Sequence, residues 1–236
     1  MPAYNAAKTI RPTYNDLPKD LIADIILVDD ASTDNTVQIA KKLGIKVIVH
    51  PKNKGYGANQ KTCYDQALKA KPHIVVMAHP DYQYDAKLLG VLCEPIVNGR
   101  ADIMLGSRIQ TRRQVLAGGM PLWKYFANRA LTLFENLAMG LNLSEYHTGF
   151  RAYSAKVLKT VPFHKFSDDF VFDQQILISA LSFGFNISEI PVPCKYFPEA
   201  SSINFKRSTK YGLQTLWIVL MYLLNQIGIV KTDIFK

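Results

Sequence analysis

The sequence has few cysteines, and none of the three is placed for a shared structural role. Cys63, Cys93 and Cys194 lie far apart, they are odd in number, and no CxxC pair occurs. Neither a disulfide framework nor a structural zinc site is therefore indicated, and a reducing cytoplasm is the expected compartment. The first five residues, Met-Pro-Ala-Tyr-Asn, contain no apolar run, so no signal peptide is predicted.

Internal repeats and low-complexity tracts are also absent, and long uncharged stretches are scarce. Residues 213–230 carry no charged side chain, but they include Gln214, Asn225 and Gln226. Their length is borderline for a bilayer span. We therefore expect an amphipathic or hydrophobic helix here that associates with a membrane, and leave open whether it spans one.

What the chain has in excess is positive charge. Its 236 residues include 28 Lys and Arg against 19 Asp and Glu, a formal net charge of +9. This excess favours anionic partners such as phosphates or acidic lipid headgroups. Nucleic acid is not predicted as a partner, because the aromatic residues are not concentrated in a basic repeat and no zinc-finger spacing occurs.

Apolar runs alternate with helical patterns through the first half of the chain. Buried strands are predicted at 23–28, 45–49, 73–78 and 101–106, with helices between them. This alternation indicates βαβ units, and so an α/β fold with a mainly parallel, Rossmann-like sheet flanked by helices. In the second half, we predict helices at 123–139 and 172–182, a polar turn at 148–154 and a strand at 187–192.

Polar residues follow several of these strands. Asp29 and Asp30 end the first, His79-Pro80-Asp81 follows the third, and Ser107-Arg108 follows the fourth. Ligands in such sheets bind outside the carboxyl ends of the strands. Asp81 and the amide of Gln83 could ligate a hard divalent cation, and Arg108 could meet pyrophosphate charge. Each residue taken alone could equally be a helix cap or a solvated turn, but the agreement of several strand ends favours a site.

Five motifs together resemble the family 2 glycosyltransferases, and most closely the dolichyl- or polyprenyl-phosphate sugar transferases. They are Pro-Ala-Tyr-Asn at 2–5, Ile-Leu-Val-Asp-Asp-Ala-Ser-Thr-Asp-Asn-Thr at 26–36, Asn-Lys-Gly-Tyr-Gly at 53–57, Gly-Ser-Arg at 106–108 and Thr-Gly-Phe-Arg-Ala-Tyr-Ser at 148–154. The resemblance runs from residue 2 to about residue 212. Only the second motif is specific on its own.

The resemblance implies a GT-A fold that binds a nucleotide-diphosphate sugar with Mg²⁺ or Mn²⁺ and transfers the sugar with inversion. It places six residues beside the nucleotide: Pro2, Ala3, Tyr4, Asp29, Asp30 and Gly57. The family's Asp-x-Asp-x-Gln metal motif aligns with residues 79–83, where Asp81 and Gln83 match and His79 replaces the first Asp. Imidazole suits Mn²⁺ and softer ions better than Mg²⁺, so the preferred metal is open.

Two other departures concern the ends of the resemblance. Chains of this type lead into Pro-Ala-Tyr-Asn through an apolar strand, whereas here Pro2 follows Met1, and we expect that the first strand is truncated. The family's Arg and Gly-Ser-Lys after Tyr196, close to the donor phosphates, are not seen at 197–207. Lys206, Arg207 or Lys210 could supply the missing cation.

On the acceptor side, Asp173 is the candidate catalytic carboxylate, with Asp168 or Asp169 as alternatives. Arg151 could bind an acceptor phosphate, and the metal-binding Asp81 completes the predicted catalytic set. A hydroxyl acceptor needs a general base, whereas a phosphate acceptor is already anionic. A helix-face role for Asp173 and a structural ion pair for Arg151 are equally open. His147 is left outside the site, because lone histidines are more often structural.

The expected domains are a glycosyltransferase domain at 1–205 and a membrane-associating segment at 206–236. The aromatic stretch around Trp123, with Arg112, Arg113 and Lys124 nearby, could form an interfacial helix. The predicted location is the cytoplasmic face of a membrane, held peripherally or by a single C-terminal anchor.

The prediction is therefore a glycosyltransferase that uses a nucleotide sugar and a lipid-linked acceptor, most simply a polyprenyl phosphate. One alternative is transfer to the hydroxyl of a saccharide. Another is a truncated, non-catalytic remnant that binds nucleotide sugars, which the first-strand and His79 departures would explain. A nucleotidyltransferase is less favoured, because its glycine- and lysine-rich N-terminal phosphate loop is not present.

Overall fold

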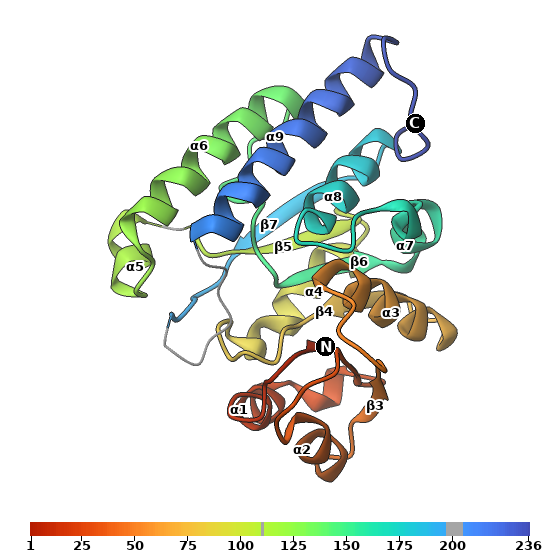
Figure 1. The fold of residues 1–236 in the computed structure, drawn as a ribbon, viewed down its shortest axis with the longest axis vertical. Helices are drawn as coiled ribbons and strands as arrows, with labels where there is room; N and C mark the ends of the chain where they lie inside the picture. Colours follow the sequence, from red (N-terminus) through yellow and green to blue (C-terminus); the bar gives the residue numbers. More distant parts are fainter. Residues whose placement is uncertain (110, 197–204) are drawn as a thin grey trace.

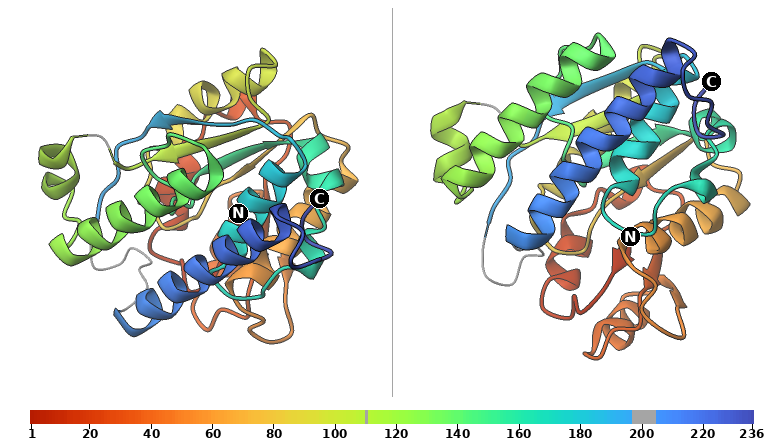
Figure 2. Two further views of the ribbon diagram at one scale, coloured as in Figure 1. Left: turned by 90° about the horizontal axis from the view of Figure 1, so that it is seen from above. Right: turned by 45° about the horizontal axis from the view of Figure 1, so that its top comes forward.

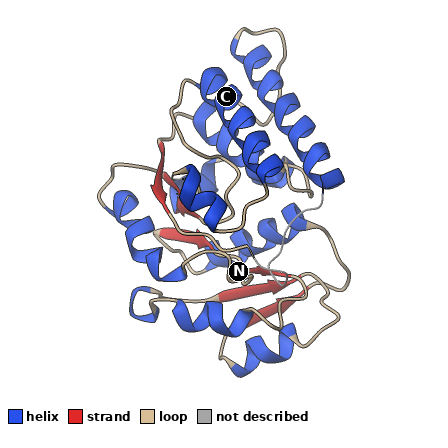
Figure 3. Ribbon diagram, turned by 90° about the vertical axis from the view of Figure 1, so that its left-hand side faces the viewer, coloured by secondary structure: helices blue, strands red, loops and turns tan. Residues whose placement is uncertain are grey.

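The strands of the protein form two sheets that lie between layers of helices (Figures 1 and 3). The computed structural model describes residues 1–109, 111–196 and 205–236. The first sheet has the order β1-β2-β3, and all its strands are parallel. Its strands are β1 (Pro2–Ala3), β2 (Ile26–Asp29) and β3 (Lys46–Val49).

The second sheet has the order β4-β6-β5-β7, and its strands are β4 (Ile74–Met77), β5 (Ile103–Ser107), β6 (Arg151–Ser154) and β7 (Ile187–Pro191). β5 and β7 are parallel, whereas β6 runs antiparallel to both of its neighbours. The mainly parallel α/β architecture is therefore confirmed, with one inserted antiparallel strand.

The predicted polar turn at 148–154 is wrong in its second half, because residues 151–154 form β6. Their letters, Arg-Ala-Tyr-Ser, carry no apolar run that would indicate a strand. The strand forms because β6 pairs on both sides, with Met77 opposite Arg151 on β4 and Leu105 opposite Arg151 on β5. Arg151, Ala152 and Tyr153 are consequently buried.

Helices cover the sheets on both faces (Figure 2). Their bounds are α1 Ile10–Asp16, α2 Thr36–Lys42, α3 Tyr56–Lys69, α4 Leu89–Val97, α5 Arg112–Ala117, α6 Leu122–Met139, α7 Ala155–Thr160, α8 Phe172–Ser182 and α9 Phe205–Gln226, with short 3-10 turns at Lys19–Leu21, Ala86–Leu88 and Phe163–Lys165. One apolar cluster joins the sheets to α3, α8 and α9, and a second joins them to α1 and α4. Each fully buried aliphatic or aromatic side chain in these clusters contributes about 1.5–3 kcal/mol.

The N-terminus is held against β2. The ammonium group of Met1 donates a hydrogen bond to the carbonyl of Ile26 (2.8 Å), and Pro2 and Ala3 pair in parallel with Val28 and Asp29. β1 is therefore two residues long in this structure.

The C-terminal segment forms α9, which lies beside α6 across one face of the second sheet (Figures 1 and 2). Ile218 and Val219 of α9 are buried in the core. Among the described residues, no helix is long and apolar enough to cross a bilayer. The separate domain predicted at 206–236 remains a prediction, although α9 packs closely on the rest of the chain.

Candidate active site

Two cavities meet on the side of the sheets where β1 and β4 end. The first, called here the N-terminal pocket, has a volume of about 1010 Å³ and lies between β1, the glycine loop before α3 and the first turns of α9. The second, called the helix pocket, has a volume of about 180 Å³ and lies beneath α6 and α9. The predicted site residues divide between these two cavities and the scaffold around them.

Six of the residues predicted for the donor or the metal line the N-terminal pocket: Pro2, Ala3, Tyr4, Asp30, His79 and Asp81. Three of these come from the end of β1 and two from the end of β4. The sequence-based expectation that polar strand ends gather at one edge therefore matches this arrangement, as parallel βαβ units require. Arg108 and Gln83 line the helix pocket instead.

Asp29 and Asp30 have different surroundings although they are adjacent. The carboxylate of Asp29 is fully buried and accepts hydrogen bonds from the backbone N–H and the hydroxyl of Ser32. The carboxylate of Asp30 accepts hydrogen bonds from the backbone N–H groups of Lys54 and Gly55, and from Nδ1 of His50 at 2.7 Å. Both carboxylates shape the loops beside the pocket, and nucleotide contact by either stays a prediction.

Gly57 serves the packing of α3. A Cβ atom at this position would lie 2.4 Å from the carbonyl oxygen of Ser167, and the N–H of Gly57 donates to the carbonyl of Asp168 at 2.8 Å. Only glycine lets the first turn of α3 approach the backbone before α8 this closely. Tyr56, one residue earlier, is thereby fixed in both pockets.

His79 and Asp81 form the centre of the site. Partial burial lowers the pKa of His79, so its imidazole is neutral at pH 7, and its Nε2 lies 3.3 Å from the hydroxyl of Tyr56. Burial also raises the pKa of Asp81 above its usual value. The backbone N–H of Gln83 donates to the Asp81 carboxylate at 3.1 Å. The charge of Asp81 is thus poorly compensated by the protein itself.

These residues fit a divalent cation that is bound jointly with a ligand. The described residues contain no group of three His, Cys, Asp or Glu side chains arranged to hold a metal. A neutral imidazole, one carboxylate and one amide oxygen would leave coordination positions for phosphate oxygens. Such a mixed nitrogen and oxygen set suits Mn²⁺ better than Mg²⁺.

Positive charge enters the N-terminal pocket from the first turns of α9. Lys206, Arg207 and Lys210 all line it, and Nζ of Lys210 contacts the Asp169 carboxylate at 2.5 Å. The sequence named these three residues as candidate cations without placing them. The preceding segment 197–204, where the family's own basic motif was sought, lies outside the described residues.

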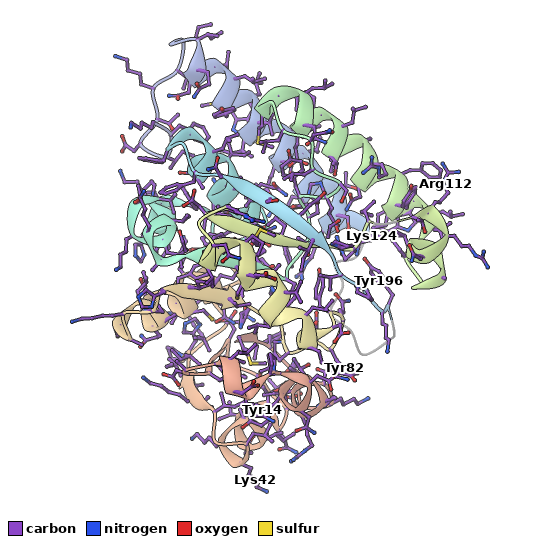
Figure 4. The ribbon with its side chains drawn as sticks, turned by 180° about the vertical axis from the view of Figure 1, so that it is seen from behind. Tyr14, Lys42, Tyr82, Arg112, Lys124 and Tyr196 are labelled. Carbon is purple, nitrogen blue, oxygen red and sulfur yellow. The ribbon has the colours of Figure 1, made fainter. Side chains whose placement is uncertain are left out.

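Two cationic side chains line the helix pocket: Arg108, which is paired with a carboxylate, and Lys124. Arg108 donates through its backbone N–H, Nε and Nη2 to the fully buried Glu145, and through Nη1 to the hydroxyl of Tyr196 (2.8 Å). Lys124 on α6 places its ammonium group 5.3 Å from the centre of the Tyr196 ring, as the neighbouring labels in Figure 4 also show. Burial, and then the Arg108 charge, lower the pKa of Lys124.

Asp173 lines the helix pocket with both of its oxygens occupied. They accept hydrogen bonds from the Tyr56 hydroxyl and from Nε2 of Gln60, each at 2.8 Å. Nη2 of Arg151 lies 3.6 Å from the same carboxylate. Arg151 is buried and donates to the carbonyls of Tyr146, Thr148 and Asp173. The catalytic roles predicted for these two residues stay predictions, and the contacts give Arg151 a supporting position behind Asp173.

The two pockets share five lining residues: Tyr56, His79, Asp81, Phe170 and Tyr211. Any atom passed between ligands in the two pockets must cross this junction. Sequence reasoning identified His79 and Asp81 but not the three aromatic residues. Tyr56 lies inside the glycine-loop motif, which offered a signal, whereas nothing local marks Phe170 or Tyr211.

The chain belongs to glycosyl transferase family 2, whose sequence pattern matches residues 1–161. It is therefore a glycosyltransferase, and neither the nucleotidyltransferase nor the non-catalytic alternative is needed. It is 30% identical over 213 residues to a UDP-N-acetylglucosamine–dolichyl-phosphate N-acetylglucosaminyltransferase of Methanococcus voltae, covering 83% of this chain and 84% of that protein. It is 27% identical over 195 residues to a dolichyl-phosphate hexose transferase of Haloferax volcanii, covering 82% and 80%.

The fold also matches a solved glycosyltransferase. Glucosyl-3-phosphoglycerate synthase of Mycobacterium tuberculosis, crystallised with Mn²⁺ and UDP-glucose, superposes with a TM-score of 0.70 at 19% identity, over 98% of this chain and 78% of that one. At this identity the match establishes the GT-A fold alone.

Proposed function

We propose that this glycosyltransferase takes a sugar from a nucleotide-diphosphate sugar in the N-terminal pocket and transfers it, with inversion, to a polyprenyl phosphate in the helix pocket. The observation that carries the proposal is the junction at Asp81, where two separate cavities meet. A donor sugar reaching this point from one side meets an acceptor from the other. Such opposed entry is the geometry that in-line displacement with inversion requires.

The N-terminal pocket suits the donor because one side of it can hold a nucleoside and the other side is basic. The nucleoside would lie against Pro2, Ala3 and Tyr4, and the diphosphate would lie between Lys206 or Lys210 and Asp81. Lysine and arginine side chains stabilise the diphosphate, which carries the departing electron pair. The solved structure with UDP-glucose supports a donor of this class.

A divalent ion would be held by Asp81 and His79, with the amide of Gln83 beside them, together with the diphosphate. When bound, it would neutralise the charge that develops on the leaving group. Mn²⁺ is the expected ion, because of the imidazole in place of a carboxylate. The raised pKa of Asp81 agrees with a carboxylate that lacks its counter-charge.

The helix pocket suits an anionic acceptor. Glu145 largely neutralises Arg108, and Lys124 adds a second positive charge to the lining of this pocket. Burial partly desolvates its ammonium group and lowers its pKa. A bound phosphate would stabilise the charged form of this lysine. The names of the Methanococcus and Haloferax relatives, which act on dolichyl phosphate, support the same acceptor class.

A membrane surface is the proposed location, because the α6–α9 pair buries several polar side chains and exposes many large apolar ones. Asn128, Thr132 and Glu135 of α6 are buried, as is Thr215 of α9. The exposed faces carry large apolar side chains: Leu122, Trp123, Phe126, Leu133 and Leu137 on α6, and Leu213, Leu216, Trp217 and Leu220 on α9. This is the reverse of a helix pair in water.

An anionic bilayer is the occupant that fits this apolar face. Arg112 begins α5 at the outer edge visible in Figure 4, and Lys124 lies in the first turn of α6. Basic residues beside exposed aromatic residues are typical of helices that lie in the headgroup region. Trp123 belongs both to this face and to the helix pocket, so a lipid acceptor could enter the pocket from the membrane. The cytoplasmic side is proposed from the absence of paired cysteines.

Membrane contact is tested by vesicle co-sedimentation. Replacing Leu213 and Trp217 by Ser should lower partitioning onto vesicles of mixed anionic and zwitterionic lipid about 10-fold or more, because each apolar side chain that enters the bilayer contributes about 1.5–3 kcal/mol. Val97→Ser, an equally exposed apolar residue on α4, is the control and should change nothing. Unchanged partitioning of the double variant would refute the membrane face.

The activity is tested by sugar transfer from UDP-, GDP- and dTDP-sugars to a short polyprenyl phosphate with Mn²⁺ or Mg²⁺. Product should require both the lipid and Asp81, and Asp81→Ala should abolish it with the fold intact. Lys124→Met should raise the KM for the lipid about 10-fold, while the donor KM stays constant. Lipid-independent turnover with a saccharide acceptor would overturn the phosphate proposal in favour of the hydroxyl alternative.

A further inference from the structure

Beneath the junction of the two pockets lies a chain of polar groups that the proposed phosphate transfer does not use. The Tyr211 hydroxyl lies 2.8 Å from Nδ1 of His147. Nε2 of the same imidazole lies 3.2 Å from Oε2 of Glu135, an ion-pair distance without hydrogen-bond alignment. Glu135 comes from α6, His147 from the loop before β6, and Tyr211 from α9.

The tautomer of His147 follows from these neighbours. The Nε2 of Gln174 donates to the Tyr211 hydroxyl at 2.8 Å and lies equally close to Nδ1 of His147. The Tyr211 hydroxyl accepts from Gln174 and donates its own proton to the single lone pair of Nδ1. Nδ1 is then the acceptor, and the imidazole proton resides on Nε2, 3.2 Å from the Glu135 carboxylate.

Glu135 is the group that lacks compensation. It is fully buried, and its Oε1 has no hydrogen-bond partner among the described residues. An isolated buried carboxylate is costly, and a positive charge on the adjacent imidazole would relieve that cost.

The other charges around His147 are already paired. Arg108, whose Nη2 donates to the His147 carbonyl at 2.7 Å, is neutralised by Glu145. On the α8 side, Asp173 faces Arg151 at 3.6 Å. Glu135 is consequently the charge that acts on the imidazole without a counter-ion of its own.

Tyr211 connects this chain to the reaction. It is one of the five residues shared by both pockets, and its hydroxyl contacts Nδ1 of His147. Burial, followed by the Glu135 charge, raises the pKa of Tyr211, so it remains a phenol that passes a proton on rather than a tyrosinate.

We propose that Glu135, His147 and Tyr211 form a proton relay that lets this site transfer sugar to a hydroxyl acceptor, such as an alcohol or water, in addition to a phosphate. The inference rests on the proposed donor site. Tyr211 is the catalytic residue, and His147 and Glu135 act through it.

The step balances as follows in atoms and electrons. The acceptor hydroxyl gives its proton to the Tyr211 oxygen while the Tyr211 proton moves to Nδ1 of His147, leaving an imidazolium beside the Glu135 carboxylate. The acceptor oxygen forms its bond to the anomeric carbon. The bond from that carbon to the diphosphate oxygen breaks, and the diphosphate keeps the electron pair. His147 then returns its proton to solvent.

The test compares acceptors that do and do not carry a proton. Donor hydrolysis and transfer to a short alcohol are measured beside transfer to a polyprenyl phosphate at pH 8, where a phosphate with a second pKa of about 6 is almost wholly dianionic. Tyr211→Phe and His147→Gln should lower the first two rates about 100-fold or more, the range of general-base catalysis. They should lower transfer to the dianion less than about 3-fold. Tyr222→Phe, the same change farther along α9, is the control.

Equal losses with all acceptors would show a purely structural role and would overturn the relay. So would a wild-type enzyme that transfers to neither water nor alcohol. Nitrogen-15 spectra of His147 give a second measurement that needs no turnover: the tautomer with its proton on Nε2 is expected, and a proton on Nδ1 would contradict the relay. If only the lipid phosphate fails as acceptor while hydrolysis responds to the variants, the proposed acceptor falls and the relay stands.

Discussion

Removing Arg108 while keeping Glu145 should destabilise the protein strongly, for a reason unrelated to catalysis. Glu145 is fully buried and accepts hydrogen bonds from the Arg108 backbone N–H at 2.7 Å, its guanidinium, and Nδ2 of Asn128. Arg108→Met would leave a buried carboxylate without its cation. Breaking a buried pair in this way costs about 3–5 kcal/mol. For a chain of this size, that corresponds to a fall in Tm of roughly 6–20 °C.

A compensated variant separates this structural cost from the function of Arg108. Arg108→Met with Glu145→Gln removes both charges and keeps an amide oxygen for Asn128 to contact. We expect its free energy of unfolding to return to within about 2 kcal/mol of the wild type. The KM for the lipid acceptor should stay close to that of the wild type, because the two charges that are removed neutralise each other and Lys124 is retained. Calorimetry and transfer kinetics on the three proteins measure both quantities.

The pH dependence of unfolding gives an independent check of the same pair. Burial acts to raise the pKa of Glu145, but the Arg108 charge and hydrogen bonds outweigh it, so the pKa is held below the 4.5 that is usual for a glutamate. A depressed carboxylate pKa contributes stability above 4.5 that is lost as the pH falls through the folded value. The wild type should lose this contribution on acidification, and the double variant should not. A single Arg108→Met variant as stable as the wild type would refute the reasoning.

Three further outcomes are expected. Gly57→Ala should cost about 1–3 kcal/mol and lower Tm, because its Cβ would clash with backbone before α8. The same change at Gly212 within α9, where the nearest atom is at 3.6 Å, should raise stability by about 1 kcal/mol, and equal Tm values for the two would contradict the packing argument. His79→Asp should shift the metal preference of transfer from Mn²⁺ toward Mg²⁺, read from metal titrations. Lys210→Met should raise the KM for the donor several-fold. A change confined to the KM for the acceptor would show that Lys210 does not serve the donor.

The sequence was sufficient to predict those parts of the fold that repeat a local pattern. The strands expected at 23–28, 45–49, 73–78 and 101–106 correspond to β2, β3, β4 and β5, because buried strands leave apolar runs. β6 left no such run, since its burial comes from pairing on both sides rather than from its composition.

A site residue could be predicted from the sequence only where a recognisable motif also lines a pocket. Asp81 follows a strand and lines both pockets, whereas Gly57 belongs to the glycine-loop motif and packs against Ser167. A motif marks a position that cannot vary freely, and both roles produce that constraint. Tyr211 and Lys124 reach the pockets only through the packing of α9 and α6, which no short stretch of sequence encodes.

α9 shows why these functions constrain one another. Its inward face carries Tyr211, Thr215 and Ile218, spaced by three or four residues so that they lie along one side of the helix. Leu213 and Trp217 lie on the outward face, and Lys210 points into the N-terminal pocket at its start. All these residues are fixed on one helix, so in the proposed membrane-bound state a bilayer that held the outward face would also set the position of Tyr211 at the junction. Under these proposals, a variant that tilts α9 should alter vesicle binding and acceptor choice together.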